Sequence, residues 1–275
     1  MQGATRYFVV NTGRSGSTLL SVILADAGAA FGLPIPRSWD PGGGEMEHPL
    51  GLRATAAFRR AFRAGSTKPE GWLRRRAWQL HRSSGRRALR KLLAQAEIVK
   101  CEDLDLVVAS VLKLGFFPKV VLCYRRFEDY AVSRGLLKSS ANVDALLAQY
   151  CRTYRNGWLL LQTFGGCAVG FDELTDLTAT SWAGALARVT GFDAESLLVA
   201  RARRLGKVSR PVARATFDEA ANQLFSLLAA SRGQEIPASD QAIRNWQARQ
   251  RRERAAAHAP SPLNVFPLSN HDTGD

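Results

Sequence analysis

The sequence predicts an α/β protein in three layers, with a mainly parallel β-sheet flanked by helices. Residues 7–10 form a continuously apolar run, which is typical of a strand buried on both faces. Between residues 97 and 189, apolar strands alternate with helical segments, and this order indicates βαβ units. The chain has 275 residues, of which 46% are hydrophobic, so one α/β domain with a large core accounts for its length.

The amino-terminal elements are predicted in the order strand, loop, helix. A strand is expected over residues 6–11 and a helix over residues 17–28, where leucine and isoleucine recur at helical spacing. Residues 32–49 are rich in Pro and Gly, which indicates a long functional loop. Residues 52–94 are amphipathic and strongly basic, so we expect an Arg-rich helical insert at about residues 50–95.

The rest of the chain continues this alternation and then loses it. The expected elements are strands over 97–101, 119–124 and 167–171, and helices over 104–114, 127–137, 143–164, 174–189, 197–205 and 217–230. Beyond Trp246, Pro, Ser, Asn and Asp replace the periodic apolar residues. We therefore expect a single domain over residues 1–246 and a mobile or extended tail over residues 247–275.

Composition limits the class of partner and the compartment. Lys and Arg total 38 against 24 Asp and Glu, and the net charge of +14 favours anionic partners, although GC-rich coding also raises the arginine and alanine content. The cysteines are widely spaced, without a CxxC pair or a nearby histidine cluster, so we expect neither zinc nor a disulfide. No apolar stretch is long enough to span a bilayer and no signal peptide is recognisable, so we expect a cytoplasmic protein.

The loop between the first strand and the first helix has the composition of an anion-binding site. A helix N-terminus offers unpaired backbone N–H groups and the positive end of the helix dipole, which favour phosphate or sulfate. Glycines let the backbone approach an anion closely, hydroxyls donate hydrogen bonds, and arginine adds a forked, permanent charge. The loop residues that supply these groups are Gly13, Arg14, Ser15, Gly16, Ser17 and Thr18. An ordinary turn with capping serines explains the hydroxyls but not the glycines and the arginine.

The loop departs from the nucleotide triphosphatase pattern GxxxxGK[ST]. Its two glycines are too close together, and no lysine precedes the final Ser-Thr pair. The metal partners that the sequence offers are Glu102 and Asp103, which follow the second predicted strand. A metal-dependent kinase or a nucleotide hydrolase with a degenerate loop is therefore disfavoured and is kept as the alternative enzyme class. We expect no bound metal.

The sequence GRSGSTLL after a strand resembles the 5′-phosphosulfate-binding loop of sulfotransferases that use 3′-phosphoadenosine 5′-phosphosulfate (PAPS). In that family a basic residue is followed by Ser-Gly and two hydroxyl residues, and the basic residue is often arginine in bacterial members. The resemblance implies a P-loop-like α/β fold of the sulfotransferase type. It also implies that PAPS is the co-substrate and that Arg14, Ser15, Gly16, Ser17 and Thr18 bind its 5′-phosphosulfate.

A second segment, KVVLCYRRFEDYAVS, matches the family where its 3′-phosphate site is found. It reads as a buried strand that ends in arginine, with a serine eight residues later. The resemblance implies that Arg125 and Ser133 bind the 3′-phosphate of PAPS. The family normally has proline where this chain has Phe127, so Arg126 is the alternative to Arg125.

Weaker similarity supports the fold more than the chemistry. The sequence GFDELTD at residues 170–176 is similar to a late strand–helix unit of the family. The family's C-terminal segment that closes over the cofactor has only a loose candidate here, at residues 204–207. The resemblance thus covers about residues 6–30 and 95–192.

The reaction that the resemblance implies is transfer of a sulfonate to a hydroxyl or amine, which needs a general base opposite the sulfonate. The family often carries this base, His or Glu, after the first helix, and here that segment offers Glu45, Glu47 and His48. Arg14 would stabilise the leaving phosphate, and Lys100 is a further candidate at the end of the second strand. A non-catalytic anion-binding module is the second alternative to this interpretation.

The expected acceptor is a hydroxyl-bearing small molecule, glycolipid or polysaccharide. The Arg-rich helices are expected on the acceptor side, where three roles are open: holding an anionic glycan, peripheral contact with a membrane surface, or simple solvated helix faces. No nucleic-acid partner is expected.

Overall fold

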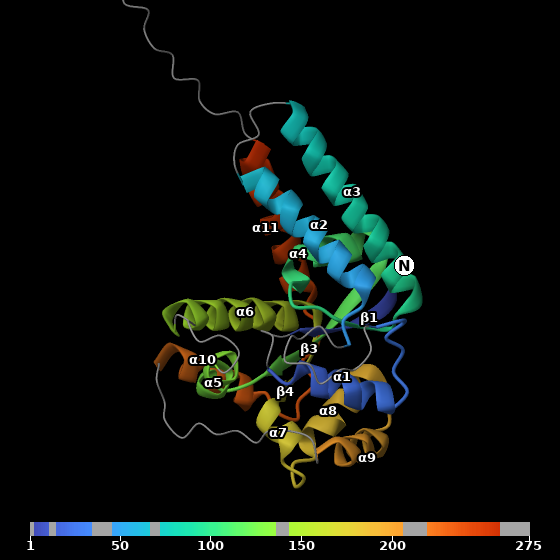
Figure 1. Cartoon of the computed structure of the whole chain (residues 1–275), viewed down its shortest axis with the longest axis vertical. Helices are drawn as coiled ribbons and strands as arrows, with labels where there is room; N and C mark the ends of the chain where they lie inside the picture. Colours follow the sequence, from blue (N-terminus) through green and yellow to red (C-terminus); the bar gives the residue numbers. More distant parts are fainter. Residues whose placement is uncertain are drawn as a thin grey trace, which may run out of the picture.

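The computed structural model describes residues 3–10, 15–34, 46–66, 72–135, 143–205 and 219–258. The fold has the predicted three-layer α/β architecture (Figure 1). The sheet has the strand order β2-β1-β3-β4, and each neighbouring pair is parallel, as predicted. The strands are β1 (Ala4–Val10), β2 (Ile98–Lys100), β3 (Phe116–Tyr124) and β4 (Gly166–Gly170).

Alternating side chains of the buried strands build a separate core on each face of the sheet. In β1, Phe8 and Val10 pack on one face and Val9 packs on the other; in β3, Leu122 and Cys123 divide in the same way. Because both faces are apolar, the strands read as unbroken apolar runs. One face is covered by α4 (Leu104–Lys113), α6 (Val143–Phe164) and α10 (Glu219–Ala230), and the other by α1 (Ser17–Asp26), α8 (Ser181–Thr190) and α9 (Ala194–Arg204).

The Arg-rich insert forms two long helices, α2 (Pro49–Ser66) and α3 (Trp72–Gln95), that extend away from the sheet (Figure 1). Their inner faces join the core beside α4, through residues such as Phe58 and Leu92. The helices approach closely at Gly85, where a Cβ would lie 2.9 Å from the Phe58 ring. Most of the described arginines on these helices are exposed, so the insert has a basic outer surface.

The carboxyl-terminal region differs from the boundary predicted at residue 246. Trp246 lies inside α11 (Asp240–His258) and packs edge-on against Phe164, with ring centroids 5.4 Å apart. Residues 247–258 are therefore helical rather than an extended tail, and residues 259–275 lie outside the described residues. The grouping of residues 1–246 into one domain stays a prediction.

The helix expected over residues 174–189 is interrupted. Helix α7 (Phe171–Thr175) ends at Asp176, whose side chain accepts a hydrogen bond from the Thr178 N–H (2.9 Å). Such a side-chain turn competes with the helical backbone bonds, so the chain leaves the helix before α8 begins.

Strand β3 begins three residues earlier than predicted, and it runs through Pro118. The Val120 N–H donates to the Gly165 carbonyl on the β4 side of the strand (2.9 Å). Position 118, two residues earlier, faces the same side, where pairing with β4 has not yet begun. A proline there loses no bond of the ladder, so the strand tolerates it.

The four cysteines form no disulfide; Cys123 and Cys167 are buried, whereas Cys101 and Cys151 are half-buried. Burial raises the pKa of the Cys123 thiol to about 12. Of the helices in the described part of the chain, none combines the length and the apolar character needed to cross a membrane.

Candidate functional site

The strand order places a topological switch point, where open α/β sheets form a crevice, at the carboxyl ends of β1 and β3. The chain leaves β1 through α1 toward β2 on one side, and leaves β3 through α5 (Phe127–Gly135) and α6 toward β4 on the other side. In open α/β sheets, ligands bind where neighbouring connections diverge in this way. The two segments singled out in the sequence follow these two strands, so the topology brings them to one place.

The loop after β1 turns into α1 at Gly16. Gly16 is the N-cap of α1 and has a φ of 92°, a region that residues with a Cβ rarely adopt. A Cβ at this position would overlap the Cδ2 atom of Phe171. Ser15 and Ser17 are buried, and the Ser15 hydroxyl has no hydrogen-bond partner within the described residues. Arg14 lies outside the described residues.

Lys100 places a buried positive charge beside this loop. It is the last residue of β2 and pairs with Val9 of β1, so its side chain starts next to the loop. Its Nζ atom donates a hydrogen bond to the Thr18 hydroxyl (2.9 Å), and the residue is only 8% exposed. A cation held in this position stabilises negative charge near the N-terminus of α1.

Of the two described candidate bases, Glu47 is the one that is ion-paired with this cation. Its Oε1 atom is 3.8 Å from the Nζ atom of Lys100. Burial raises the pKa of the Glu47 carboxyl, and the charge of Lys100 opposes this rise. The preceding residue, Met46, adopts a left-handed φ of 61° while its side chain is buried in the core beside α1. Burial of Met46 offsets the strain, so the backbone holds Glu47 in a fixed position.

His48 has a structural role at the start of α2. Its Nδ1 atom accepts a hydrogen bond from the Leu50 N–H (3.0 Å), and its carbonyl accepts one from the Leu52 N–H (3.1 Å). The ring also packs near Gly32, where a Cβ would lie 3.1 Å from the His48 Cδ2 atom. Burial lowers the pKa of His48, which keeps the imidazole neutral as an acceptor. Glu45, the third candidate base, lies outside the described residues.

Phe171 lies between Arg125 and Gly16 of the loop and contacts both residues. The Arg125 guanidinium lies over the Phe171 ring, 4.1 Å from its centroid, and the same ring contacts Gly16. The Nε atom of Arg125 is also 4.0 Å from the Oδ2 atom of Asp129. The two predicted anion-binding segments are therefore separated by a single phenyl ring.

Two tyrosines of α6 fix the backbone of Arg125. The Arg125 N–H donates to the Tyr154 hydroxyl (3.1 Å), and the Tyr150 hydroxyl donates to the Arg125 carbonyl (2.8 Å). Burial raises the pKa of Tyr150 above its ordinary value, so its hydroxyl stays protonated and can donate. The arginine is thereby held at the strand end before any ligand binds.

Arg125 and the next residue, Arg126, point to opposite faces of the sheet: Arg125 stacks on Phe171, and Arg126 stacks on Phe225. Ser133 is half-buried on α5, four residues after Asp129, so these two residues share a face of that helix, and Asp129 is the one that is ion-paired with Arg125. Arg126 is exposed, and its guanidinium lies 4.8 Å from the ring centroid of Phe225 on α10. The geometry thus favours Arg125 over Arg126 for an anion in the crevice.

Sequence reasoning missed a polar network at the carboxyl ends of β3 and β4. The Nε atom of Arg232 donates to the Tyr124 hydroxyl (2.8 Å), and its Nη2 atom donates to the Asp172 carboxylate (2.5 Å). Glu173 accepts a hydrogen bond from the Gly170 N–H (2.9 Å). The acidic pair in GFDELTD was a signal for this network, whereas no motif around Arg232 indicated it.

Of the loose candidate at residues 204–207, Arg204 lies away from the loop, and residues 206 and 207 lie outside the described residues. Arg204 binds Asp26, the last residue of α1, with its Nε atom 2.6 Å from the Oδ2 atom. A helix of 10 residues is about 15 Å long, so this ion pair lies one helix length from Gly16.

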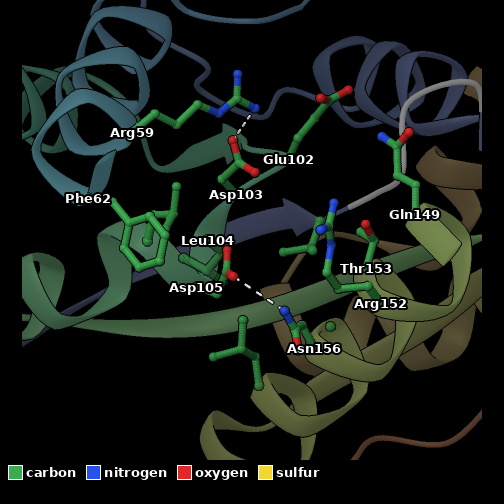
Figure 2. Close-up of a pocket in the computed structure, with 14 residues that line it drawn as sticks. Arg59, Phe62, Glu102, Asp103, Leu104, Asp105, Gln149, Arg152, Thr153 and Asn156 are labelled. Carbon is green, nitrogen blue, oxygen red and sulfur yellow. Dashed lines mark hydrogen bonds and ion pairs between the residues drawn. The ribbon is translucent and has the colours of Figure 1, made fainter. Parts of the chain in front are cut away.

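A cavity of about 510 Å³ lies beside the site, among α2, α4 and α6 (Figure 2). Val10, the last residue of β1, lines it, so the cavity starts where β1 leads into the loop. Glu102 and Asp103 line it from the segment after β2, and Asp103 is ion-paired with Arg59. Within the described part of the chain, no group of three or more His, Cys, Asp or Glu side chains is arranged to hold a metal ion.

Comparison with solved structures finds a sulfotransferase domain from the Synechococcus PCC 7002 olefin synthase. The likeness covers 83% of this chain and 95% of that domain, with 16% sequence identity and a TM-score of 0.48. No family model and no curated protein matches the chain.

Proposed function

We propose that this chain is a sulfotransferase that moves a sulfonate from PAPS to a hydroxyl or amine of an acceptor. The observation that carries this proposal is the contact of one ring, Phe171, with both Gly16 and Arg125. The segments that resemble the 5′-phosphosulfate site and the 3′-phosphate site of the family thus lie at adjacent strand ends, close enough to serve one nucleotide.

The described residues fit the 5′-phosphosulfate group. The first backbone N–H groups of α1 have no acceptor within the helix and point along its positive dipole end. The Thr18 hydroxyl accepts a hydrogen bond from Lys100, so it brings this cation to the site. The buried Ser15 hydroxyl has no hydrogen-bond partner among the described residues and is available to the ligand. Arg14 completes this set in the proposal, from its place in the sequence.

The chemical step needs charge stabilisation and one proton transfer. The acceptor oxygen attacks the sulfur, and the bond from sulfur to the bridging oxygen breaks. That oxygen leaves with the electron pair as 3′-phosphoadenosine 5′-phosphate. Lys100 stabilises the charge that develops on the leaving phosphate, and Glu47 accepts the acceptor proton. The raised pKa of Glu47 increases its strength as a base at neutral pH.

The test is calorimetric binding of 3′-phosphoadenosine 5′-phosphate, with and without magnesium. Arg125→Met should weaken binding by about 10–150-fold, the range for about 1.5–3 kcal/mol of charge-assisted hydrogen bonding. Arg126→Met is the matched control, because Arg126 lies over Phe225, and it should leave the affinity unchanged.

Three results would contradict the proposal. The first is equal loss in the Arg125 and Arg126 variants, and the second is a preference for ATP with magnesium, which favours the kinase or hydrolase alternative. The third is anion binding without any sulfonate transfer from PAPS to a panel of hydroxyl and amine acceptors, which favours a non-catalytic module.

A further inference from the structure

The cavity among α2, α4 and α6 is placed and sized for a second small molecule. Its volume of about 510 Å³ falls within the range of about 300–1,000 Å³ that is typical of ligand pockets. Figure 2 shows Arg59 and Phe62 on one side, Asp103 and Asp105 beside them, and Asn156 on the α6 side. The cavity is distinct from the crevice that Arg125 and Gly16 flank, but it starts at the same strand, β1.

The charge of the cavity lining is opposite to that of the protein. Three carboxylates, Glu102, Asp103 and Asp105, face two guanidinium groups, Arg59 and Arg152, which leaves a net charge of −1. The whole chain carries +14. Arg59, which α2 contributes to the lining, is ion-paired with Asp103, so its charge is already neutralised. An anionic ligand would therefore meet an unfavourable field here, despite the basic insert.

The polar groups of the lining suit a hydroxylated ligand. Asp105 accepts a hydrogen bond from the Asn156 Nδ2 atom (3.3 Å), and Thr153 lines the cavity on the same helix as Asn156. Carboxylate and amide groups bind hydroxyls as acceptors and donors at once. Phe62 is 65% exposed and offers a flat apolar face, which packs against the C–H face of a ring.

Glu47 connects this cavity with the nucleotide side. Its carboxyl interacts electrostatically with Lys100, and also with Glu102, Arg59 and Asp103, which line the cavity. Lys100 in turn contacts Thr18 of the loop. Glu47 lies 3.8 Å from Lys100, and Glu102 and Asp103 of the cavity lining follow Lys100 in the chain, so a base at Glu47 is close to both proposed binding regions.

We propose that the cavity binds the acceptor, and that this acceptor is an uncharged or amine-bearing sugar ring rather than an anionic glycan. The role as acceptor site rests on the proposed sulfotransferase function, whereas sugar binding with this charge preference does not.

Saturation-transfer NMR of the full chain tests the charge preference with three matched probes. These are methyl glucoside, its 2-amino derivative and methyl glucuronide, which differ in one substituent. The neutral and amino sugars should give signals about fivefold stronger than the glucuronide, the factor expected for a single charge contact in a solvated site. Asp105→Lys changes the lining from −1 to +1 and should reverse this order.

Asp144→Lys is the matched control, since it makes the same charge change at an exposed position on α6 outside the cavity, and it should leave the order unchanged. If Asp105→Lys does not fold, Asp105→Asn serves instead: it changes the lining from −1 to 0 and should abolish the excess of the neutral and amino sugar signals over the glucuronide signal. Asn156→Leu should weaken all three signals.

The outcomes separate this inference from the proposed function. Absence of sugar signals in the wild-type protein, or a stronger glucuronide signal, overturns the inference even if 3′-phosphoadenosine 5′-phosphate binds. An unchanged order in the Asp105 variants overturns it as well. Sugar binding in the expected order without nucleotide binding supports the cavity as a sugar site and refutes the sulfotransferase proposal.

Discussion

Replacing Gly16 with alanine should destabilise the protein through its contact with Phe171. The φ of 92° at Gly16 is unfavourable for any residue with a Cβ, and the new Cβ would overlap the Phe171 ring. The ring must then move, and Arg125, which stacks on this ring, moves with it. Gly28→Ala is a matched control, because Gly28 has a φ of 98° but a Cβ added there would have no neighbouring atom within 4 Å.

The expected cost has two parts. A left-handed backbone costs a residue with a Cβ about 1–2 kcal/mol, and this part applies to both alanine variants. Overpacking against Phe171 adds about 1–3 kcal/mol, and this part applies only at Gly16. The free energy of unfolding of Gly16→Ala should therefore be about 2–5 kcal/mol lower than that of the wild type. For Gly28→Ala it should be about 1–2 kcal/mol lower.

Calorimetric unfolding measures the difference between the two variants. At about 2–4 °C per kcal/mol for a chain of this size, Gly16→Ala should melt roughly 2–12 °C below Gly28→Ala. In a Phe171→Ala background the ring is gone, so the cost of Gly16→Ala should fall to that of Gly28→Ala. Equal melting temperatures of the two single variants, or an unchanged cost without Phe171, would refute this explanation.

Two further predictions concern the segment before α2. Glu47→Gln should lower kcat by about 10²–10⁴-fold while nucleotide affinity, measured by calorimetry, is kept, and a variant with wild-type kcat would exclude Glu47 as the base. His48→Asn should remove part of the pH dependence of stability. Burial lowers the pKa of His48, so on acidification the unfolded chain binds this proton first and the wild type loses stability as pH falls below about 6.5. Urea titrations on either side of that pH should show a smaller loss in the variant, and an equal loss would contradict this role.

The parts of the fold that could be predicted are those encoded locally. Helix α6 has the predicted bounds, Val143–Phe164, because a long amphipathic pattern with buried aromatic residues such as Tyr150 and Tyr154 defines both ends. The meeting of Gly16 and Arg125 could be anticipated because parallel strands bring their carboxyl ends to one edge. Lys100 was predictable for the same reason, as the last residue of β2.

The parts that could not be predicted depend on contacts between distant segments. Glu47 and His48 are neighbours in the sequence, and only the folded chain turns one toward Lys100 and the other into the start of α2. Arg232 joins Tyr124 across 108 positions. The helix that contains Trp246 is stabilised by Phe164, a partner that local composition does not indicate.

Helix α6 contributes residues to both proposed ligand regions. Tyr150 and Tyr154 hold the backbone of Arg125, while Thr153 and Asn156, on the same helix, line the sugar-sized cavity. Because a helix moves as a rigid body, a tilt of α6 at the cavity also displaces the tyrosines that hold Arg125. Any movement of α6 that accompanies filling of the cavity should therefore displace Arg125, the proposed nucleotide ligand, and by thermodynamic reciprocity each proposed ligand would then alter the affinity of the other by the same factor.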